Sequence, residues 1–222
     1  MTPRRRPASA EQQDKRRRIL AAAARVFARK GYFGARVSEI AKRAGVADGT
    51  VYLYFHNKED VLACLFEEVM AEHIAAARAE LRLLPDGAAR LRHVAQRHLR
   101  LLGSNPDLAV VFQVELRQST KFMERFTASS FQDYLKVIEG IIDEAQREGT
   151  LRSDLSRKLL SKALFGILDE MVTSWILGRR DYDLGKLADP VVDIFLNGAS
   201  ARVTEASRTP RRAAAGRGGR PA

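Results

Sequence analysis

The sequence predicts an all-α protein, and three observations support this prediction. Apolar residues recur at three- and four-residue steps through most of the chain, as they do on one face of a helix. No run of residues alternates between apolar and polar with period two, so signals for β-strands are absent. With 45% hydrophobic and 29% charged residues among 222, the chain has enough apolar side chains to form a core.

Three helices are expected in the N-terminal part. From Lys15 the apolar residues mark one helical face, and Gly31 is expected to end this helix as its C-cap. Two short helices follow at residues 37–44 and 49–55, with Gly45 between them. The connections between these segments are short, so an N-terminal domain of three helices is expected.

A long helix and five further helical segments are expected after these. Asn57 can cap the long helix, and Asp60 three residues later approximates a capping box. The long helix is expected to end before the Pro85–Asp86–Gly87 break. The remaining helical patterns cover residues 87–104, 107–118, 121–148, 154–178 and 184–198. About nine helices in all are therefore expected.

The net charge of +11 is concentrated at the two ends of the chain. Residues 1–18 contain seven Lys and Arg against two carboxylates, and residues 201–222 contain six Arg against one. The tails at 1–14 and 201–222 lack apolar residues to bury, so we expect them to be disordered. Basic tails attract polyanions without sequence preference, and simple solvation of the tails is the alternative.

Several function classes are not supported by the sequence. The four histidines are scattered, and no HExxH, Gly-rich phosphate loop or Gly-x-Ser-x-Gly elbow occurs, so we predict no enzyme, no metal site and no cofactor. Cys64, the single cysteine, is more consistent with a buried inert thiol than with a nucleophile. Adjacent Asp169 and Glu170 point in different directions on a helix, which favours an interhelical salt bridge or a polar lining.

The same composition predicts a cytoplasmic protein. No apolar run approaches the roughly 18 residues that span a bilayer. The basic N-terminus is not followed by the apolar region of a secretory signal. One cysteine excludes a disulfide framework within the chain.

The two short helices have the pattern of a helix-turn-helix. Ala41 is small enough for the helices to approach each other, and Gly45 permits the turn. The second helix could enter the major groove of DNA, and Lys58 lies at a helix N-terminus that favours a phosphate. The exposed candidates on the second helix are Gly49, Thr50, Leu53 and Tyr54.

This segment resembles the DNA-binding module of the TetR family of bacterial transcriptional regulators. The resemblance covers residues 15–62 and rests on FARKGY, EIAKRAGV and GTVYLYFHNKEDV. It implies that Arg36, where many members have Thr, lacks the usual N-cap hydroxyl and could contact phosphate instead. For Tyr52, half-buried packing is an alternative to a phosphate bond. The DNA contacts implied by the matching positions are Val37, Ser38, Thr50, Tyr52, Tyr54 and Lys58.

The C-terminal part resembles the acyl-CoA-responsive TetR-type repressors of fatty-acid degradation. Residues 108–119 and 165–175, together with VADGTVYLYFHNKEDVL at 46–62, carry this resemblance, which would span residues 15–198. It implies that a long-chain acyl-CoA binds the protein as its effector and causes it to release double-stranded operator DNA. Arg117 could bind a phosphate, although pairing with a neighbouring carboxylate is the alternative, and core packing is the alternative for the apolar candidates. The candidate ligand-binding residues are Phe112, Leu116, Arg117, Gln118, Phe131, Leu135, Phe165, Leu168 and Trp175.

The resemblance also implies a homodimer, built by the last two long helices and reading a pseudo-palindromic operator. Trp175 and Phe165 could then face the partner chain instead of a ligand. The apolar residues expected to supply this interface are Leu164, Leu168, Met171, Val172, Trp175, Ile176, Leu187, Val191, Ile194 and Phe195.

The expected organisation is a basic tail at 1–14, a DNA-binding domain at 15–60, a ligand-binding and dimerisation domain at 61–200, and a second tail at 201–222. Two alternatives remain open: a TetR-type regulator that responds to a different amphiphile, and an architectural protein that coats DNA through its tails.

Overall fold

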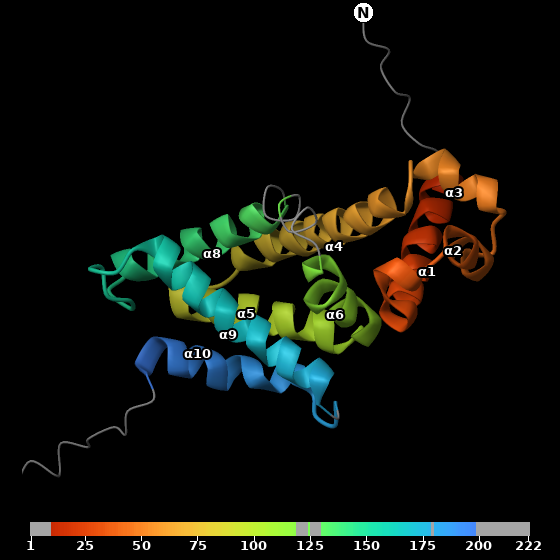
Figure 1. Ribbon diagram of the computed structural model, residues 1–222. Coiled ribbons are helices and arrows are strands. Elements are labelled where there is room, and N and C mark those ends of the chain that lie inside the picture. The colour runs from red at the N-terminus through yellow and green to blue at the C-terminus, as the bar shows by residue number, and fades with distance from the viewer. Residues whose placement is uncertain (1–9, 119–123, 125–129, 179, 199–222) are drawn as a thin grey trace, which may run out of the picture.

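The computed structural model describes residues 10–118, 124, 130–178 and 180–198, and these residues form helices joined by short loops (Figure 1). The described part contains no strand, which confirms the all-α prediction. Its α-helices are α1 (Ala10–Gly34), α2 (Val37–Ala44), α3 (Asp48–Tyr54), α4 (Lys58–Leu81), α5 (Gly87–Gly103), α6 (Pro106–Gln113), α8 (Ser130–Arg147), α9 (Arg157–Leu177) and α10 (Ala188–Asn197). Two 3-10 helices, η1 (Glu115–Arg117) and η2 (Leu184–Leu187), complete the order.

The first helix begins earlier than the sequence predicts. It starts at Ala10 and includes residues 10–14, which the sequence analysis places in the basic tail. Lys15 and Glu11 form an ion pair of 2.6 Å at spacing i, i+4, which supports the added turn. The rest of the predicted tails, 1–9 and 201–222, lies outside the described residues.

Gly31 interrupts α1, so the regular helix that begins at Ala10 ends there, as predicted. Its φ of 70° and ψ of 159° are not helical, and a short second helical segment follows as far as Gly34. The direction of the chain therefore changes three residues before α1 ends, close to the loop that leads into α2.

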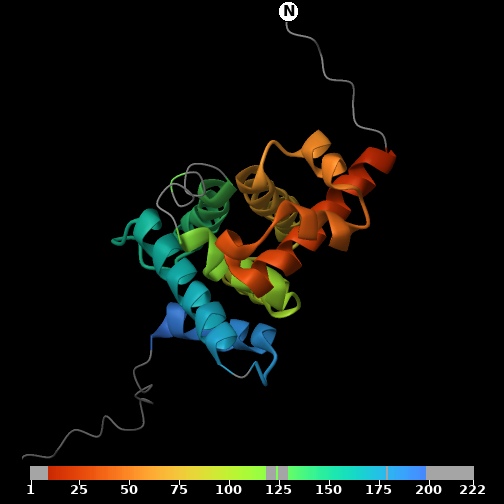
Figure 2. The same ribbon diagram turned by 45° about the vertical axis from the view of Figure 1, so that its right-hand side comes forward.

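The helices form a small N-terminal lobe of α1–α3 and a larger body of α4–α10 (Figure 1). Figure 2 shows the same division, with α9 and α10 on the side of the body away from the lobe. In the body, α5 packs against α4, α6, α8, α9 and α10. Its apolar stripe is fully buried, so α5 forms the centre of this core.

The N-terminus of α5 lies directly against α8. A Cβ atom added at Gly87 would lie 2.6 Å from Ala145 Cβ and 2.8 Å from Ala145 Cα. No larger residue fits at this position unless one of the helices moves.

Most helix boundaries follow the caps that the sequence contains. Asn57 Oδ1 accepts a hydrogen bond of 2.8 Å from the Asp60 N–H, as predicted. The Asp60 carboxylate accepts from the His56 N–H at 3.0 Å, one residue before the position that a capping box uses.

The predicted helix at 107–118 is shorter in the structure. The α-helix α6 ends at Gln113, and the chain continues as the 3-10 helix η1 after Val114. In η1, the Glu115 carboxylate accepts a hydrogen bond from the Tyr32 N–H of α1. Of the predicted helix at 121–148, the described residues are 124, which is helical, and 130–148, which include α8.

Candidate functional site

The turn between α2 and α3 has helix-turn-helix geometry. Gly45 ends α2 with a φ of 67°, which a glycine adopts without strain. The sequence predicts that Ile40, Val46 and Val51 hold the two helices together. Ile40 and Val51 are 0% and 1% exposed, as is the small Ala41 at 0%, whereas Val46 is partly buried. The helix-turn-helix prediction therefore agrees with the structure.

Two cations fix this lobe through backbone carbonyl groups. The Arg18 guanidinium donates to Ala44 O at 2.6 Å, at the C-terminus of α2. The Lys58 ammonium donates to Ala35 O at 2.9 Å and lies 4.6 Å from the centre of the Tyr32 ring. Lys58 was expected to contact a phosphate, but in this structure its ammonium connects α4 to the end of α1.

The remaining predicted DNA contacts lie at the surface of the lobe. Leu53 is 82% exposed, and Tyr52 is 56% exposed, which is compatible with the half-buried packing considered for it. Phe55, by contrast, is 1% exposed and belongs to the core. Arg36, Ser38 and Gly49 are exposed, whereas Val37, Thr50 and Tyr54 are partly buried.

Glu39 makes the reciprocal bond of a capping box at the start of α2, although Arg36 lacks the N-cap hydroxyl. Its carboxylate accepts from the Arg36 N–H at 3.2 Å and also pairs with Lys30. These two bonds lower the pKa of Glu39, with the bond from Lys30 contributing most. The Arg36 side chain makes no capping bond and stays exposed.

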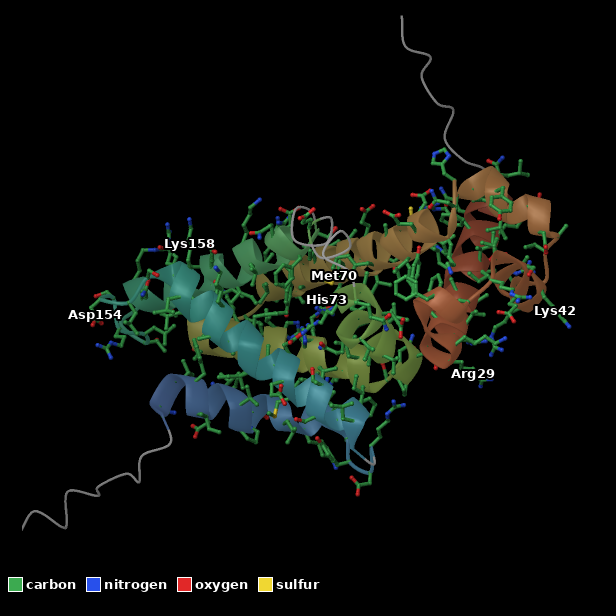
Figure 3. The ribbon with its side chains drawn as sticks, viewed as in Figure 1. Arg29, Lys42, Met70, His73, Asp154 and Lys158 are labelled. Carbon is green, nitrogen blue, oxygen red and sulfur yellow. The ribbon has the colours of Figure 1, made fainter. Side chains whose placement is uncertain are left out.

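A basic groove between α1 and α2 was not predicted from the sequence. It measures about 520 Å³, and the structure places five cations around it. Arg29 and Lys42, labelled in Figure 3, belong to it and lie on the N-terminal lobe. The basic residues that recur at spacing i, i+4 in α1 are the signal in the sequence that could have indicated this groove. The residues lining the groove are Arg25, Val26, Arg29, Lys30, Glu39, Lys42 and Arg43.

A second candidate site is an aromatic cavity inside the larger body. Its volume is about 40 Å³, because aromatic rings fill most of the space. The ring centres of Phe66 and Phe112 are 5.0 Å apart, and those of Phe131 and Phe165 are 4.8 Å apart. We call this the effector cavity; its lining residues are Phe66, Met70, His98, Leu102, Phe112, Gln113, Arg117, Phe131, Tyr134, Phe165 and Asp169.

Four of the nine predicted ligand residues line the effector cavity: Phe112, Arg117, Phe131 and Phe165. The other five do not. Leu116, Leu135 and Leu168 are buried in the core, which agrees with the alternative of core packing. Gln118 donates to the Glu115 carboxylate at 3.1 Å, and Trp175 Nε1 donates to Tyr182 O at 3.1 Å.

Asp169 holds together the polar edge of the effector cavity. Its Oδ1 accepts from Arg117 at 2.6 Å and from Gln113 Nε2 at 3.0 Å. The ion pair between Arg117 and Asp169 is thus the carboxylate pairing expected for Arg117. It is also the interhelical salt bridge expected for Asp169. Asp169 connects α9 to α6 and η1.

Two histidines and a tyrosine form a buried cluster beside the effector cavity. His98 Nδ1 lies 3.1 Å from the Tyr134 hydroxyl, and the His73 ring centre is 5.7 Å from that of Tyr134. Burial lowers the pKa of each histidine from 6.5 to about 4 and raises the pKa of Tyr134. All three side chains are therefore neutral at pH 7. Sequence reasoning missed this cluster because its members lie on three separate helices.

Glu115 connects the body to the N-terminal lobe. Its side chain is buried, and its carboxylate accepts from the Tyr32 N–H at 2.6 Å. Tyr32 directly follows the kink at Gly31. Because Glu115 lies in η1 between Gln113 and Arg117, one short segment contacts both the effector cavity and α1.

Comparison with known proteins identifies the family. Residues 19–65 match the family profile for bacterial regulatory proteins of the tetR family, and residues 66–198 match that for the YsiA-like protein C-terminal region. The chain belongs to the TetR family. The helix-turn-helix lobe is thus the DNA-binding domain of a transcriptional regulator.

Three relatives of this TetR-family chain are informative. The fatty acid metabolism regulator protein of Bacillus subtilis (strain 168) is 37% identical over 188 residues, which cover 85% of this chain and 97% of that protein. The fatty acid degradation regulator FadR from Bacillus halodurans is 38% identical, with a TM-score of 0.80 over 83% of this chain and 99% of that one. The transcriptional regulator FadR from Bacillus subtilis in complex with stearoyl-CoA is 37% identical, with the same TM-score and coverage.

The apolar stripe predicted as a dimer interface is mostly buried within this TetR-family chain itself. Leu164, Leu168 and Val172 are 0% exposed because α9 packs on α5, α6 and α8. Trp175, Ile176 and Val191 are also buried. Ile194, at 51% exposure, is the member of the stripe that faces solvent most clearly.

A membrane span, a metal site and the state of Cys64 can be assessed over residues 10–118, 124, 130–178 and 180–198. None of their helices is long and apolar enough to cross a membrane. No three His, Cys, Asp or Glu side chains among them are placed to hold a metal ion. The Cys64 thiol is half-buried, and burial raises its pKa, which disfavours the reactive thiolate.

Proposed function

We propose that this chain is a repressor that binds a palindromic operator as a homodimer and is released by long-chain acyl-CoA. Its targets would be genes of fatty-acid degradation, and it would act in the cytoplasm as a regulator without enzymatic activity. The observation that carries the proposal is an aromatic cavity with a partly exposed arginine at its edge. The solved relative in complex with stearoyl-CoA supports the identity of the effector.

The polar edge of the effector cavity suits an anionic head group. The Arg117 side chain is 38% exposed, whereas that of its partner Asp169 is 17% exposed. A phosphate of CoA can therefore approach the guanidinium from solvent and compete with the carboxylate. The acyl chain would enter between the phenylalanine rings.

Ligand entry requires the effector cavity to expand. Pockets for ligands of this size measure roughly 300–1,000 Å³, whereas this cavity measures about 40 Å³. The rings of Phe112, Phe131 and Phe165 must separate, and α6 carries the first of them. Binding of an acyl chain would thus displace α6 and η1 relative to α9.

That displacement would be transmitted to the DNA-binding lobe through Glu115. Movement of η1 pulls on the bond between the Glu115 carboxylate and the Tyr32 N–H, next to the kink at Gly31. The lobe would turn relative to the body and change the separation of the two recognition helices in the dimer. Ligand and operator would then favour different orientations of the lobe, which is the requirement for coupling between two sites.

The test is a titration of the full-length protein onto DNA from upstream of its own gene and of nearby lipid-degradation genes. It is done at about 0.15 M salt, with palmitoyl-CoA or CoA alone. We expect discrete binding to one fragment that palmitoyl-CoA abolishes and CoA does not. Discrete binding indifferent to palmitoyl-CoA would refute the effector, and equal binding to every fragment would favour the architectural alternative.

Paired variants sharpen this test. Arg117→Met should require about tenfold more palmitoyl-CoA for release, because one charge-assisted hydrogen bond to phosphate is lost. Arg82→Met makes the same change at an exposed position outside the effector cavity and should behave as the wild type. Palmitate as effective as palmitoyl-CoA would refute recognition of the CoA moiety.

A further inference from the structure

The effector cavity is lined by two side chains whose buried polar atoms have no hydrogen-bond partner among the described residues. These atoms are Gln113 Oε1 and His98 Nε2. Native proteins keep few such atoms, because a buried polar atom without a partner is costly. Two in the lining of one small cavity indicate that its occupant supplies polar partners as well as an apolar chain.

The orientation of the Gln113 amide follows from its neighbours. Its nitrogen lies 3.0 Å from Asp169 Oδ1 and 3.4 Å from Asp169 O, and both of these atoms are acceptors. A flipped amide would place oxygen against oxygen, so Nε2 must face Asp169. The side chain is 8% exposed, and its free atom is an acceptor that needs a donor from the ligand.

His98 presents the opposite requirement. The phenol of Tyr134 is the stronger donor of the two groups, so it donates to His98 Nδ1 across the 3.1 Å contact. Neutral His98 then carries its proton on Nε2. The cavity lining thus contains one free acceptor, from α6, and one free donor, from α5.

We propose that this acceptor and donor recognise the thioester–amide unit that joins the acyl chain to the pantetheine arm of the ligand. Gln113 Oε1 accepts from the amide N–H, and His98 Nε2 donates to the thioester carbonyl oxygen. The inference rests on the proposed function and adds that selection for a thioester occurs inside the cavity, independently of phosphate binding at Arg117.

A free fatty acid cannot satisfy this arrangement. Its carboxylate has no N–H for Gln113 and would lie close to Asp169, which carries the same charge. If the protein recognised its ligand through phosphate alone, the affinity of acyl compounds without phosphate would not depend on their amide group. Ligands that lack phosphate therefore separate the two cases.

The experiment measures the affinity of full-length protein by calorimetry for S-dodecanoyl-N-acetylcysteamine and for the same compound methylated on its amide nitrogen. Both carry the thioester, and the second lacks the N–H. We expect methylation to weaken binding to the wild type about tenfold, or about 1.4 kcal/mol. In Gln113→Met the parent compound should bind more weakly, and the ratio between the two compounds should fall close to one.

The matched control is Gln132→Met, the same change at an exposed position on α8, which should keep the tenfold ratio. For the carbonyl, S-dodecyl-N-acetylcysteamine, a thioether, should bind about tenfold more weakly than the thioester to the wild type. In His98→Phe, which keeps a ring in place of the imidazole, this second ratio should also approach one.

Three outcomes would overturn the inference. The first is an unchanged affinity on methylation in the wild type, a comparison that needs no variant to fold. The second is a tenfold ratio that persists in Gln113→Met. The third is failure of the parent compound to bind while dodecanoyl-CoA binds, since phosphate would then account for recognition. If dodecanoyl-CoA binds but never releases the operator, the proposed function fails and the inference about the thioester stands by itself.

Discussion

The N-terminal lobe exposes most of its candidate binding residues to solvent, whereas the body keeps most of the candidate residues of the effector cavity buried. At the surface of the lobe, cations satisfy the carbonyl groups at the helix ends: Arg18 of α1 donates to Ala44 O, and Lys58, at the start of α4, donates to Ala35 O. In the body, the effector cavity has a charged edge, where Arg117 pairs with Asp169, and a neutral lining, in which His98 and Gln113 each keep a buried atom without a partner among the described residues. The lobe therefore presents its candidate contacts outward, whereas the body keeps its candidate contacts inside.

This difference predicts how substitutions should act in the two regions. Changes around the body core should alter stability strongly, because buried groups there have no solvent to replace a lost partner. Changes on the outer surface of the lobe should alter operator affinity and leave stability unchanged. Glu115, which joins the regions, should affect both.

The largest expected effect is a loss of stability in acid. Burial lowers the pKa of His73 and His98 to about 4, whereas both return to about 6.5 on unfolding. The unfolded chain therefore binds more protons than the folded one between these values, and stability falls as pH decreases from 6.5 to 4. The loss should be on the order of 2 kcal/mol for each histidine.

Urea unfolding at fixed protein concentration, at pH 7.5 and at pH 4.5, measures this loss. His73→Phe should remove about half of the pH dependence, and exposed His56→Ala should leave it unchanged. An identical pH profile in His73→Phe would show that other groups cause the loss.

The second effect concerns packing of α5 on α8. Gly87→Ala places a Cβ 2.8 Å from the Ala145 backbone, so we expect a loss of about 3 kcal/mol in the free energy of unfolding. The matched change in the lobe, Gly49→Ala, meets nothing within 4 Å and should leave stability within about 0.5 kcal/mol or raise it. Thermal unfolding of both variants tests the contrast, and equal destabilisation would contradict it.

The third effect tests the connection between the regions. Glu115→Leu leaves the Tyr32 N–H without its acceptor and should cost about 1–2 kcal/mol of stability. It should also reduce the effect of palmitoyl-CoA on operator affinity at least severalfold. Glu115→Gln retains an acceptor and should restore most of the response. A full response in the leucine variant would exclude this route of coupling.

The smallest effect belongs to the surface of the lobe. Thr50→Ala should lower operator affinity about tenfold through a lost base or phosphate contact, with an unchanged melting temperature. Thr150→Ala, an exposed threonine in the body, provides the control and should change neither quantity. Fluorescence anisotropy on the operator measures the affinity, and an unaffected Thr50 variant would remove this residue from the predicted contacts.

Local signals were sufficient for the DNA-binding lobe. The apolar spacing, the glycine at position 45 and the cap at Asn57 act within one or two turns of helix, so they can be interpreted without a fold. They predicted the helix-turn-helix and its exposed second helix. The same local rules placed the start of α1 five residues late, because the pair Glu11–Lys15 extends a helix that apolar spacing alone does not mark.

Long-range packing decided the rest. The bond from Tyr32 to Glu115 joins residues 83 apart in the chain, and the bond from Gln113 to Asp169 joins residues 56 apart. Periodicity shows that Leu168 and Trp175 lie on an apolar face, but it cannot show whether that face meets a ligand, a partner chain or the protein's own core. The helices and the DNA-binding motif follow from the sequence, because they depend on neighbouring residues. The cavity, its unpaired polar atoms and its link to the lobe follow from the folded structure, because they depend on which helices pack against each other.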